Sequence, residues 1–116
     1  MKALFLDDNL YRAEVFKRLN LGAICVETSE ECIELLGEDW DLVSLDHDLG
    51  GEYFVDSDRE DCGMEVVRYI ALNQPEHLRS TEFIVHSHNT EAAGEMVEIL
   101  TSAGYSCVYK PFSFFA

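Results

Sequence analysis

Polar side chains that could do chemistry gather at four points of the chain, each directly after a short apolar stretch. These points are Asp7 and Asp8, Asp46 to Asp48, His86 to Asn89, and Lys110. Carboxylates can bind a divalent cation, imidazoles transfer protons near neutral pH, and a lysine can neutralise developing negative charge. These residue types therefore suit acid–base catalysis if the fold brings the four points together.

The central point lies in the stretch WDLVSLDHDLGG, residues 40–51. Its first half reads as an apolar strand that runs directly into Asp46, His47 and Asp48, and two glycines then allow a sharp turn. A buried strand of an open α/β sheet presents its carboxyl end to the crevice that binds ligands. An acidic turn that merely ends a strand would give the same sequence pattern. The polar clusters that follow other strands favour a functional site instead.

The apolar pattern of the chain predicts five strands that alternate with helices. We expect strands over 2–6, 23–26, 40–45, 83–85 and 105–109, a helix over 64–72, and helices that follow the caps Asn9, Thr28 and Thr90. Short connections between alternating elements imply parallel strands with helices on both faces. The predicted fold is an α/β, doubly wound, five-stranded parallel sheet of the flavodoxin type, formed by a single domain over residues 1–116.

In the strand order 2-1-3-4-5, the first, third and fourth strands are neighbours and their carboxyl ends share one edge. Residues about 40 positions apart in the sequence then meet in one pocket. The alternation of side chains along a strand raises one difficulty, because Asp46 and His47 should point to opposite faces, as should His86 and Ser87. Only a bend at both strand ends would turn all four side chains into the pocket.

The composition limits the partners of the protein. With 23 acidic and 8 basic residues, the formal net charge is -15. Such a field repels a long polyanion, and the chain offers no basic stripe, so extended nucleic-acid binding is disfavoured. A small phosphate compound or a single RNA terminus remains compatible, because a divalent ion and a few donors can reverse the potential locally.

The sequence carries no membrane signal and no disulfide signal. No apolar run reaches the roughly 18 residues that span a bilayer, and residues 1–8 lack the features of a signal peptide. The 4 cysteines are dispersed without metal-ligand spacing, which is typical of reduced thiols. We therefore expect a cytoplasmic protein with no disulfide, no zinc site and no membrane partner.

Two segments lack a regular apolar pattern. Residues 50–62 are acidic and aperiodic, and they form either a lid beside the site or a solvated connection without a catalytic role. The aromatic residues Phe112, Phe114 and Phe115 follow the last strand. We expect this tail to plug the core or to form a short helix.

The layout resembles the receiver domain of two-component response regulators over almost the whole chain. The motif LFLDD, residues 4–8, is similar to the acidic pair that holds Mg²⁺ in that family. Asp46 falls at the phosphate-accepting aspartate of the family, and Ser87 falls near its hydroxyl position. Lys110 and Pro111 look like the lysine and proline after the last receiver strand, and the similarity implies a cis bond between them.

Three features depart from an ordinary receiver, namely His47 beside the acceptor position, His86 and His88 around the hydroxyl position, and the inserted segment 50–62. The combination of LDD with Arg12, SLDHDLG, the helix at Gly63 and VHSHN is similar to the cyclic-phosphate processing receiver domains of bacteria and phages. That resemblance implies a hydrolase that opens a cyclic phosphate in place of phospho-signalling.

Opening a five-membered cyclic phosphate needs a base that deprotonates water and an acid that protonates the departing sugar oxygen. His47 and His86 come from adjacent strand ends and are the expected catalytic pair, and Asp46 or Asp48 would fix a histidine tautomer. The expected substrate is the 2′,3′-cyclic phosphate of an RNA end or of a small nucleotide derivative. The side chains expected to bind the phosphate are Arg12, Ser87, Asn89 and Lys110.

The acidic residues of the site have two readings. Asp7, Asp8 and Asp46 either hold Mg²⁺ or another divalent cation, or they share protons because three carboxylates lie together. Lys110 could simply neutralise these carboxylates, and Arg12 could be a surface residue of a helix.

Two other functions compete with hydrolysis. The chain could be a signalling domain that accepts a phosphoryl group on Asp46, or a degenerate receiver that binds a partner through its acidic face. The extra histidines speak against a pure adaptor, although His88 taken alone reads as a structural residue.

Overall fold

Five short strands form one parallel sheet in the order β2-β1-β3-β4-β5. The computed structural model describes residues 1–113 of the chain. The strands are β1 (Ala3–Leu6), β2 (Ile24–Val26), β3 (Leu42–Leu45), β4 (Glu82–Val85) and β5 (Ser106–Tyr109). The predicted doubly wound sheet and its strand order are confirmed.

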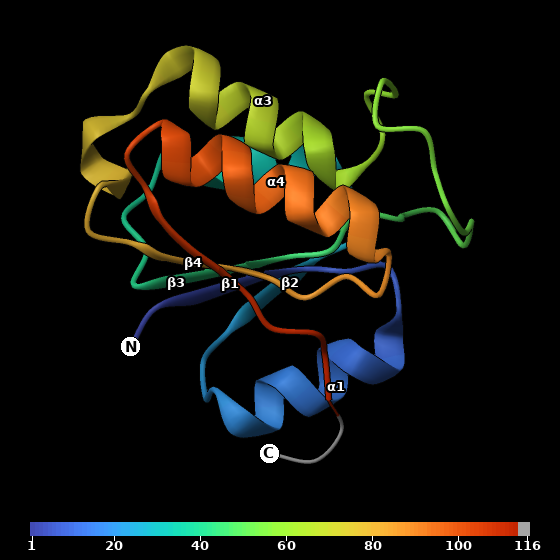
Figure 1. Ribbon diagram of the computed structural model, residues 1–116. Helices are drawn as coiled ribbons and strands as arrows, with labels where there is room; N and C mark the ends of the chain where they lie inside the picture. Colours follow the sequence, from blue (N-terminus) through green and yellow to red (C-terminus); the bar gives the residue numbers. More distant parts are fainter. Residues whose placement is uncertain (114–116) are drawn as a thin grey trace.

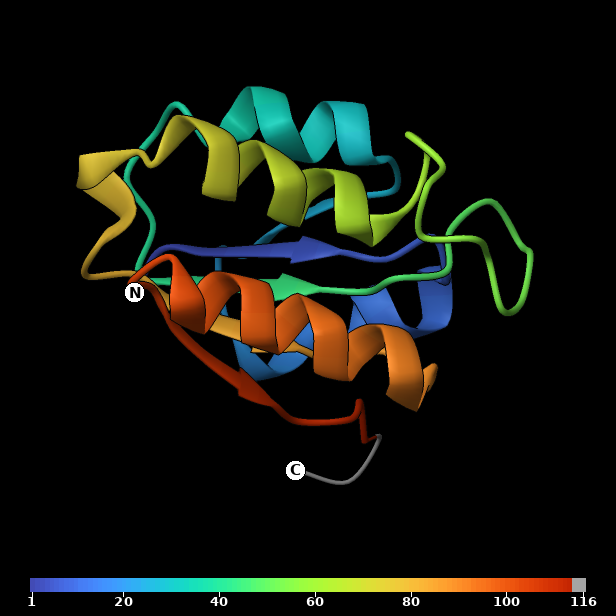
Figure 2. The same ribbon diagram turned by 45° about the horizontal axis from the view of Figure 1, so that its top comes forward.

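Helices cover both faces of this sheet (Figure 1). They are α1 (Leu10–Leu19), α2 (Ser29–Leu35), α3 (Gly63–Asn73) and α4 (Thr90–Ser102), and a short 3-10 helix, η1 (Glu76–Leu78), precedes β4. In the part of the chain that the structure describes, α1 lies alone on one face, and α2, α3 and α4 share the other (Figure 2). No helix within residues 1–113 has the length and apolar character needed to cross a membrane.

Because side chains alternate along the strands, they pack into two separate apolar clusters, one on each face of the sheet. Val43 and Leu45 of β3 belong to the larger cluster, on the side of α2, α3 and α4. Phe5 of β1 stacks on Phe16 of α1 in the smaller cluster, with ring centroids 4.4 Å apart. Odd-numbered side chains of β3 and β4 therefore face α3 and α4, whereas even-numbered ones face α1.

Two asparagine caps fix the helices that begin at the carboxyl edge of the sheet. The Asn9 side chain accepts a hydrogen bond from Arg12 N at 3.0 Å and starts α1. Asn89 Oδ1 accepts from Ala92 N at 3.3 Å and starts α4. The expectation that Thr90 caps this helix is wrong by one residue, because the preceding asparagine, a strong N-cap type, takes the position.

The chain continues along β4 after the last strand ends. Lys110 N donates to Val85 O and Phe112 N donates to His86 O, both at 3.0 Å. This pairing keeps the segment extended, and no peptide bond within residues 1–113 is cis, so the expected cis bond before Pro111 is wrong. The Phe112 ring packs against Phe5, as expected for a core plug. Phe114 and Phe115 lie outside the described residues.

Candidate active site

A cavity of about 370 Å³ opens at the carboxyl edge of the sheet. The ends of β1, β3 and β4 supply most of its polar lining, and the segment after Gly50 supplies its rim. The lining residues are Asp8, Asn9, Arg12, Asp46, Asp48, Gly51, Glu52, Tyr53, Phe54, His86, Ser87, His88 and Asn89. Most of the side chains predicted to form the site therefore meet in one place.

Asp7 is the buried acceptor at the centre of the hydrogen bonds behind this cavity. Its Oδ1 accepts from Asn9 N at 2.8 Å and from Arg12 Nη2 at 3.0 Å. Its Oδ2 accepts from Arg12 Nε at 2.8 Å and from His86 Nε2 at 2.9 Å. Burial alone would raise the pKa of Asp7, but the hydrogen bonds from His86 and Arg12 outweigh it and lower the pKa. Asp7 is therefore ionised and holds Arg12 in place.

His86 is a buried, neutral imidazole on the α1 side of the sheet. Its ring stacks on Phe5, with centroids 4.5 Å apart and planes 8° apart. Burial lowers the pKa of His86 more than the neighbouring Asp7 raises it. Because Asp7 can only accept, Nε2 carries the proton, and Nδ1 accepts from the Ser44 hydroxyl at 2.8 Å.

Asp46 is a buried carboxyl group that is about half protonated near neutral pH. Arg12 Nη2 lies 3.6 Å from its Oδ2, and His47 N donates to its Oδ1 at 2.8 Å. Burial and the negative charge of Asp7 raise the pKa of Asp46 to about 7, against the opposing effects of these two donors. This raised pKa is what we expect if the acidic residues share protons, one of the two readings of the sequence.

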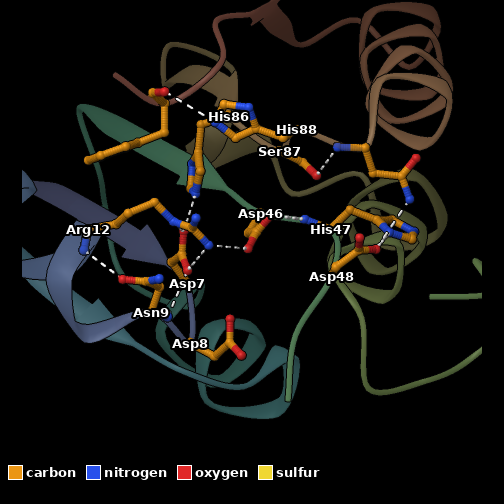
Figure 3. Close-up of polar contacts among 12 residues, drawn as sticks. Asp7, Asp8, Asn9, Arg12, Asp46, His47, Asp48, His86, Ser87 and His88 are labelled. Carbon is orange, nitrogen blue, oxygen red and sulfur yellow. Dashed lines mark hydrogen bonds and ion pairs between the residues drawn. The ribbon is translucent and has the colours of Figure 1, made fainter. Parts of the chain in front are cut away.

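His47 lies outside the cavity, under the segment that follows Gly50. Its ring is fully buried, with Nδ1 2.7 Å from Asp48 Oδ1 and Nε2 3.0 Å from Ser57 Oγ. In Figure 3, Asp46 lies between Arg12 on one side and His47 with Asp48 on the other. Both ring nitrogens of His47 thus have partners within the protein.

The structure does not bring His47 and His86 face to face. The strand alternation continues past β3 through Asp46 and His47 and past β4 to His86, so His86 faces Phe5 and α1, whereas His47 faces Ser57 near the start of α3. The expected pairing of the two imidazoles across a phosphate is therefore not present in this geometry. Side chains alternate between the two faces of the sheet along a strand, and this alternation keeps the two imidazoles apart.

The remaining predicted residues divide between the cavity and the surface. Ser87 and Asn89 line the cavity, where Asn89 Nδ2 donates to Asp48 Oδ1 at 3.2 Å. His88 also lines it, and its Nε2 lies 3.2 Å from Phe112 O. Lys110 is exposed and lines a different cavity beside α1, because β5 ends on the far side of β4. Arg12, rather than Lys110, is the cation beside the carboxylates.

The acidic cluster has the donor atoms of a metal site, and those of Asp7 already accept hydrogen bonds from the protein. Ligand atoms of Asp7, Asp46 and His86 all lie within 4.8 Å of one another. A carboxylate offers about four acceptor positions, and Asn9, Arg12 and His86 fill those of Asp7. A divalent ion at this cluster would therefore have to displace at least one of the donors that Asp7 now binds.

Asp8, the third expected metal ligand, is turned towards the inserted segment. Its Oδ2 accepts a hydrogen bond from Gly51 N. Asp48 holds the same segment further along, because Phe54 N and Val55 N donate to its two oxygens at 2.8 and 3.1 Å. The first part of the segment 50–62 therefore forms the rim of the cavity, where we expected a lid.

Sequence reasoning missed two hydroxyl groups that complete these networks. Ser44 binds the His86 ring, and Ser57 binds the His47 ring. Ser44 could have been found, because it shares a strand face with Asp46 and lies next to Ile84 in the register of β3 and β4. Ser57 lies in an aperiodic loop, where no pattern in the sequence marks it.

Comparison with protein families gives one match over most of the chain. The family model described as "Cyclic-phosphate processing Receiver domain" matches residues 2–102. A search of curated protein sequences finds no significant match.

Comparison with solved structures returns response regulators, a receiver domain and an adenylate cyclase. A response regulator from Burkholderia pseudomallei, solved with a phosphorylated aspartic acid, a calcium ion and citrate, has a TM-score of 0.63 and 18% identity, over 97% of this chain and 61% of that one. The receiver domain of Francisella response regulator 1452 has a TM-score of 0.62 and 19% identity, over 97% and 86%. An adenylate cyclase from Rhodopirellula baltica has a TM-score of 0.63 and 15% identity, over 97% and 77%. These TM-scores show a common fold, and at such low identities they show the fold alone.

Proposed function

The chain belongs to the cyclic-phosphate processing receiver domains, and we propose that it hydrolyses a cyclic phosphate in the cavity beside Asp46. In this reaction water attacks phosphorus, a base takes the proton of the water, and the departing sugar oxygen receives a proton. The observation that carries the proposal is the pairing of a fixed cation, Arg12, with a carboxyl group whose pKa is about 7. One binds negative charge and the other exchanges protons at neutral pH.

Arg12 is the group that stabilises the charge on the phosphate oxygens. Asp7 holds its guanidinium through two hydrogen bonds, so the cation needs no rearrangement when negative charge develops. Ser87 and Asn89 add polar groups on the same wall of the cavity. His86 acts through Asp7, because its hydrogen bond fixes the carboxylate that positions Arg12.

Two proton-transferring groups line the cavity. Asp46 is nearly half protonated at neutral pH, so it can give or take a proton. His88 is the second group, because its imidazole borders the cavity and is exposed, whereas the rings of His47 and His86 are buried with both nitrogens bonded. His47 then serves to hold Asp48 and the rim.

The resident cation of the site is Arg12, and a divalent ion would have to displace it. Mg²⁺ at Asp7 and Asp46 would compete with the hydrogen bonds that Arg12 makes to the same carboxylates. We therefore expect hydrolysis to change less than about twofold when EDTA removes divalent ions. Loss of turnover in EDTA, with recovery on adding Mg²⁺, would assign the cation role to a metal.

The substrate in this proposal is a nucleotide-sized cyclic phosphate, such as the 2′,3′-cyclic end of an RNA. Tyr53 and Phe54 line the rim with side chains that are 87% and 83% exposed. Exposed aromatic rings at the mouth of a polar cavity can stack on a nucleobase. The cavity volume of about 370 Å³ suits a single nucleotide end.

The experiment that tests this function is a screen of 2′,3′-cyclic and linear phosphodiesters followed by ³¹P NMR of the products. Asp46→Asn and Arg12→Ala should each lower kcat/KM by about 10² or more, because one removes the proton carrier and the other the cation. Arg18→Ala is the matched control, since Arg18 is an exposed residue of the same helix. Equal turnover in Arg12→Ala and Arg18→Ala would reject the role of Arg12.

A second candidate function, phosphorylation of Asp46, has one observation in its favour. Asp46 follows β3 directly and lines the cavity, so its carboxyl group borders the space that a small phosphodonor would enter. Incubation with acetyl phosphate and Mg²⁺, followed by intact mass measurement, would show a base-labile adduct of one phosphoryl group. An adduct that is lost in Asp46→Asn, without turnover of any cyclic phosphate, would favour signalling over hydrolysis.

A further inference from the structure

His47, which lies outside the Asp46 cavity, is at the centre of a chain of three hydrogen-bonded side chains. Asp48 Oδ1 lies 2.7 Å from its Nδ1, and Ser57 Oγ lies 3.0 Å from its Nε2. A carboxylate, an imidazole and a hydroxyl in this order are the arrangement that activates a serine nucleophile. The proposed hydrolysis of a cyclic phosphate uses neither Ser57 nor the Nε2 atom of His47.

The carboxylate of this chain is fixed in the way that an orienting group requires. Backbone N–H groups of Phe54 and Val55 and the Asn89 side chain donate to its oxygens. Burial would raise the pKa of Asp48, but the hydrogen bond with His47 and the other donors lower it. Asp48 is thus ionised and holds a proton on Nδ1 of His47, so Nε2 can accept the proton of Ser57.

Ser57 is the member of the chain that solvent reaches. His47 is fully buried, whereas Ser57 is half-buried and lines a second cavity of about 220 Å³. The first turn of α4 borders this cavity through Glu91 and Ala92. The first turn of a helix has N–H groups without intrahelical partners, and those other than Ala92 N, which the Asn89 cap binds, favour negative charge on a nearby oxygen. Such a charge develops on the carbonyl oxygen when a serine attacks an acyl group.

The charges around the second cavity limit its substrates. Glu91 and Glu95 both line it, and no lysine or arginine does so within the described residues. An anionic ligand such as a phosphate ester is therefore repelled. A neutral or cationic acyl compound meets no such barrier.

We propose that Ser57, His47 and Asp48 form a second reactive site, in which Ser57 attacks neutral or cationic acyl esters. The Ser57 Oγ–carbon bond forms as the hydroxyl proton passes to His47 Nε2. The ester C–O bond then breaks, and the alcohol leaves with that proton. Water repeats the sequence on the acyl-enzyme and releases the carboxylic acid and free Ser57. The reacting atoms of this site, Ser57 Oγ and His47 Nε2, take no part in the proposed phosphate chemistry.

The test is covalent labelling with a neutral fluorophosphonate, which transfers its phosphonyl group to an activated serine and releases HF. Intact mass measurement and peptide mapping should show one adduct, on Ser57. Ser57→Ala should abolish the adduct, and His47→Gln should slow labelling by about a hundredfold or more. The matched control is Ser102→Ala, in an exposed serine at the end of α4, which should label as the unaltered protein does. No adduct on Ser57, or equal labelling in His47→Gln, would overturn the proposal.

Two further measurements keep the result interpretable. If His47→Gln fails to fold in a thermal melt, labelling of the unaltered protein at falling pH replaces it. The rate should drop as His47 gains a proton, with Asp48 and Cys62 as the titratable groups that face its ring. Asp46→Asn should retain the Ser57 adduct, and Ser57→Ala should retain cyclic-phosphate hydrolysis. Labelling that is lost together with hydrolysis in Asp46→Asn would show one site instead of two.

Discussion

At the scale of single residues, Asp46 is a buried carboxyl group that its surroundings do not fully neutralise. Only 5% of its surface is exposed, and Asp7 adds a second negative charge nearby. Arg12 gives both oxygens of Asp7 a hydrogen bond but lies 3.6 Å from Asp46. The residue proposed to move protons is therefore also a source of instability at alkaline pH.

The pKa of Asp46 gives a stability profile with a definite sign. Its pKa rises from 3.8 in the unfolded chain to about 7 in the folded protein, so the folded state binds more protons between these values. Stability from this group is complete below pH 3.8 and falls by up to about 1.4 kcal/mol per pH unit towards pH 7. We expect Asp46→Asn to raise Tm at pH 8 and to leave it unchanged near pH 4. A lower Tm for this variant at pH 8 would show that Asp46 is ionised and well paired.

At the scale of elements, the start of α3 is pressed against the end of β3. Gly63 N donates to His47 O at 2.9 Å, and a Cβ atom on Gly63 would overlap the carbonyl oxygen of Asp46. Only glycine permits this approach, which fixes the backbone of Asp46 and His47. The start of α3 thereby sets the positions of the hydrogen-bond networks around Asp46 and around His47.

Gly63→Ala should therefore destabilise the protein by about 3 kcal/mol or more, because the backbone of Asp46 has to move. Gly94→Ala is the matched control, since Gly94 is exposed within α4 and a Cβ there meets no atom within 4 Å. That variant should gain up to about 1 kcal/mol from helix propensity. Urea unfolding of the two variants measures both values. A neutral Gly63→Ala would show that α3 can shift away from β3 at little cost.

The elements and their order could be predicted because their signals are local. Apolar runs, helix caps and short connections lie within a few residues of each other, and they gave the sheet, its order and the edge that carries the site. The networks depend on distant residues instead. Asp7 meets His86 across 79 positions, and the partner of His47 is set by the path of a loop that Asp48 holds. The alternation of side chains along the strands did indicate that His47 and His86 point to different faces of the sheet, and they do so in the structure.

Considered as a whole, the protein has a formal net charge of -15, although its proposed site binds an anion. Long-range repulsion slows the approach of a phosphate, while Arg12 attracts it only at short range. Raising the ionic strength shortens the Debye length from about 30 Å at 0.01 M to about 10 Å at 0.1 M, which screens the repulsion first.

We therefore expect KM for a cyclic phosphate to fall as NaCl rises from about 0.01 to 0.1 M, with kcat nearly constant. Initial rates at several substrate concentrations measure both constants. RNA oligonucleotides with the same cyclic end should show a larger fall in KM with salt, because each extra phosphate adds repulsion. A KM that rises with salt would mean that the local field of Arg12 governs the encounter.

The unbent end of β3 also has a consequence for how the protein can vary. Neighbouring residues there serve separate compartments, Asp46 on the side of α1 and His47 on the side of α3. A point substitution at either position can alter one compartment without touching the other. A single-codon insertion or deletion in the strand would instead exchange the two sets of groups, so variation of length at this strand should be far less tolerated than variation of residue type.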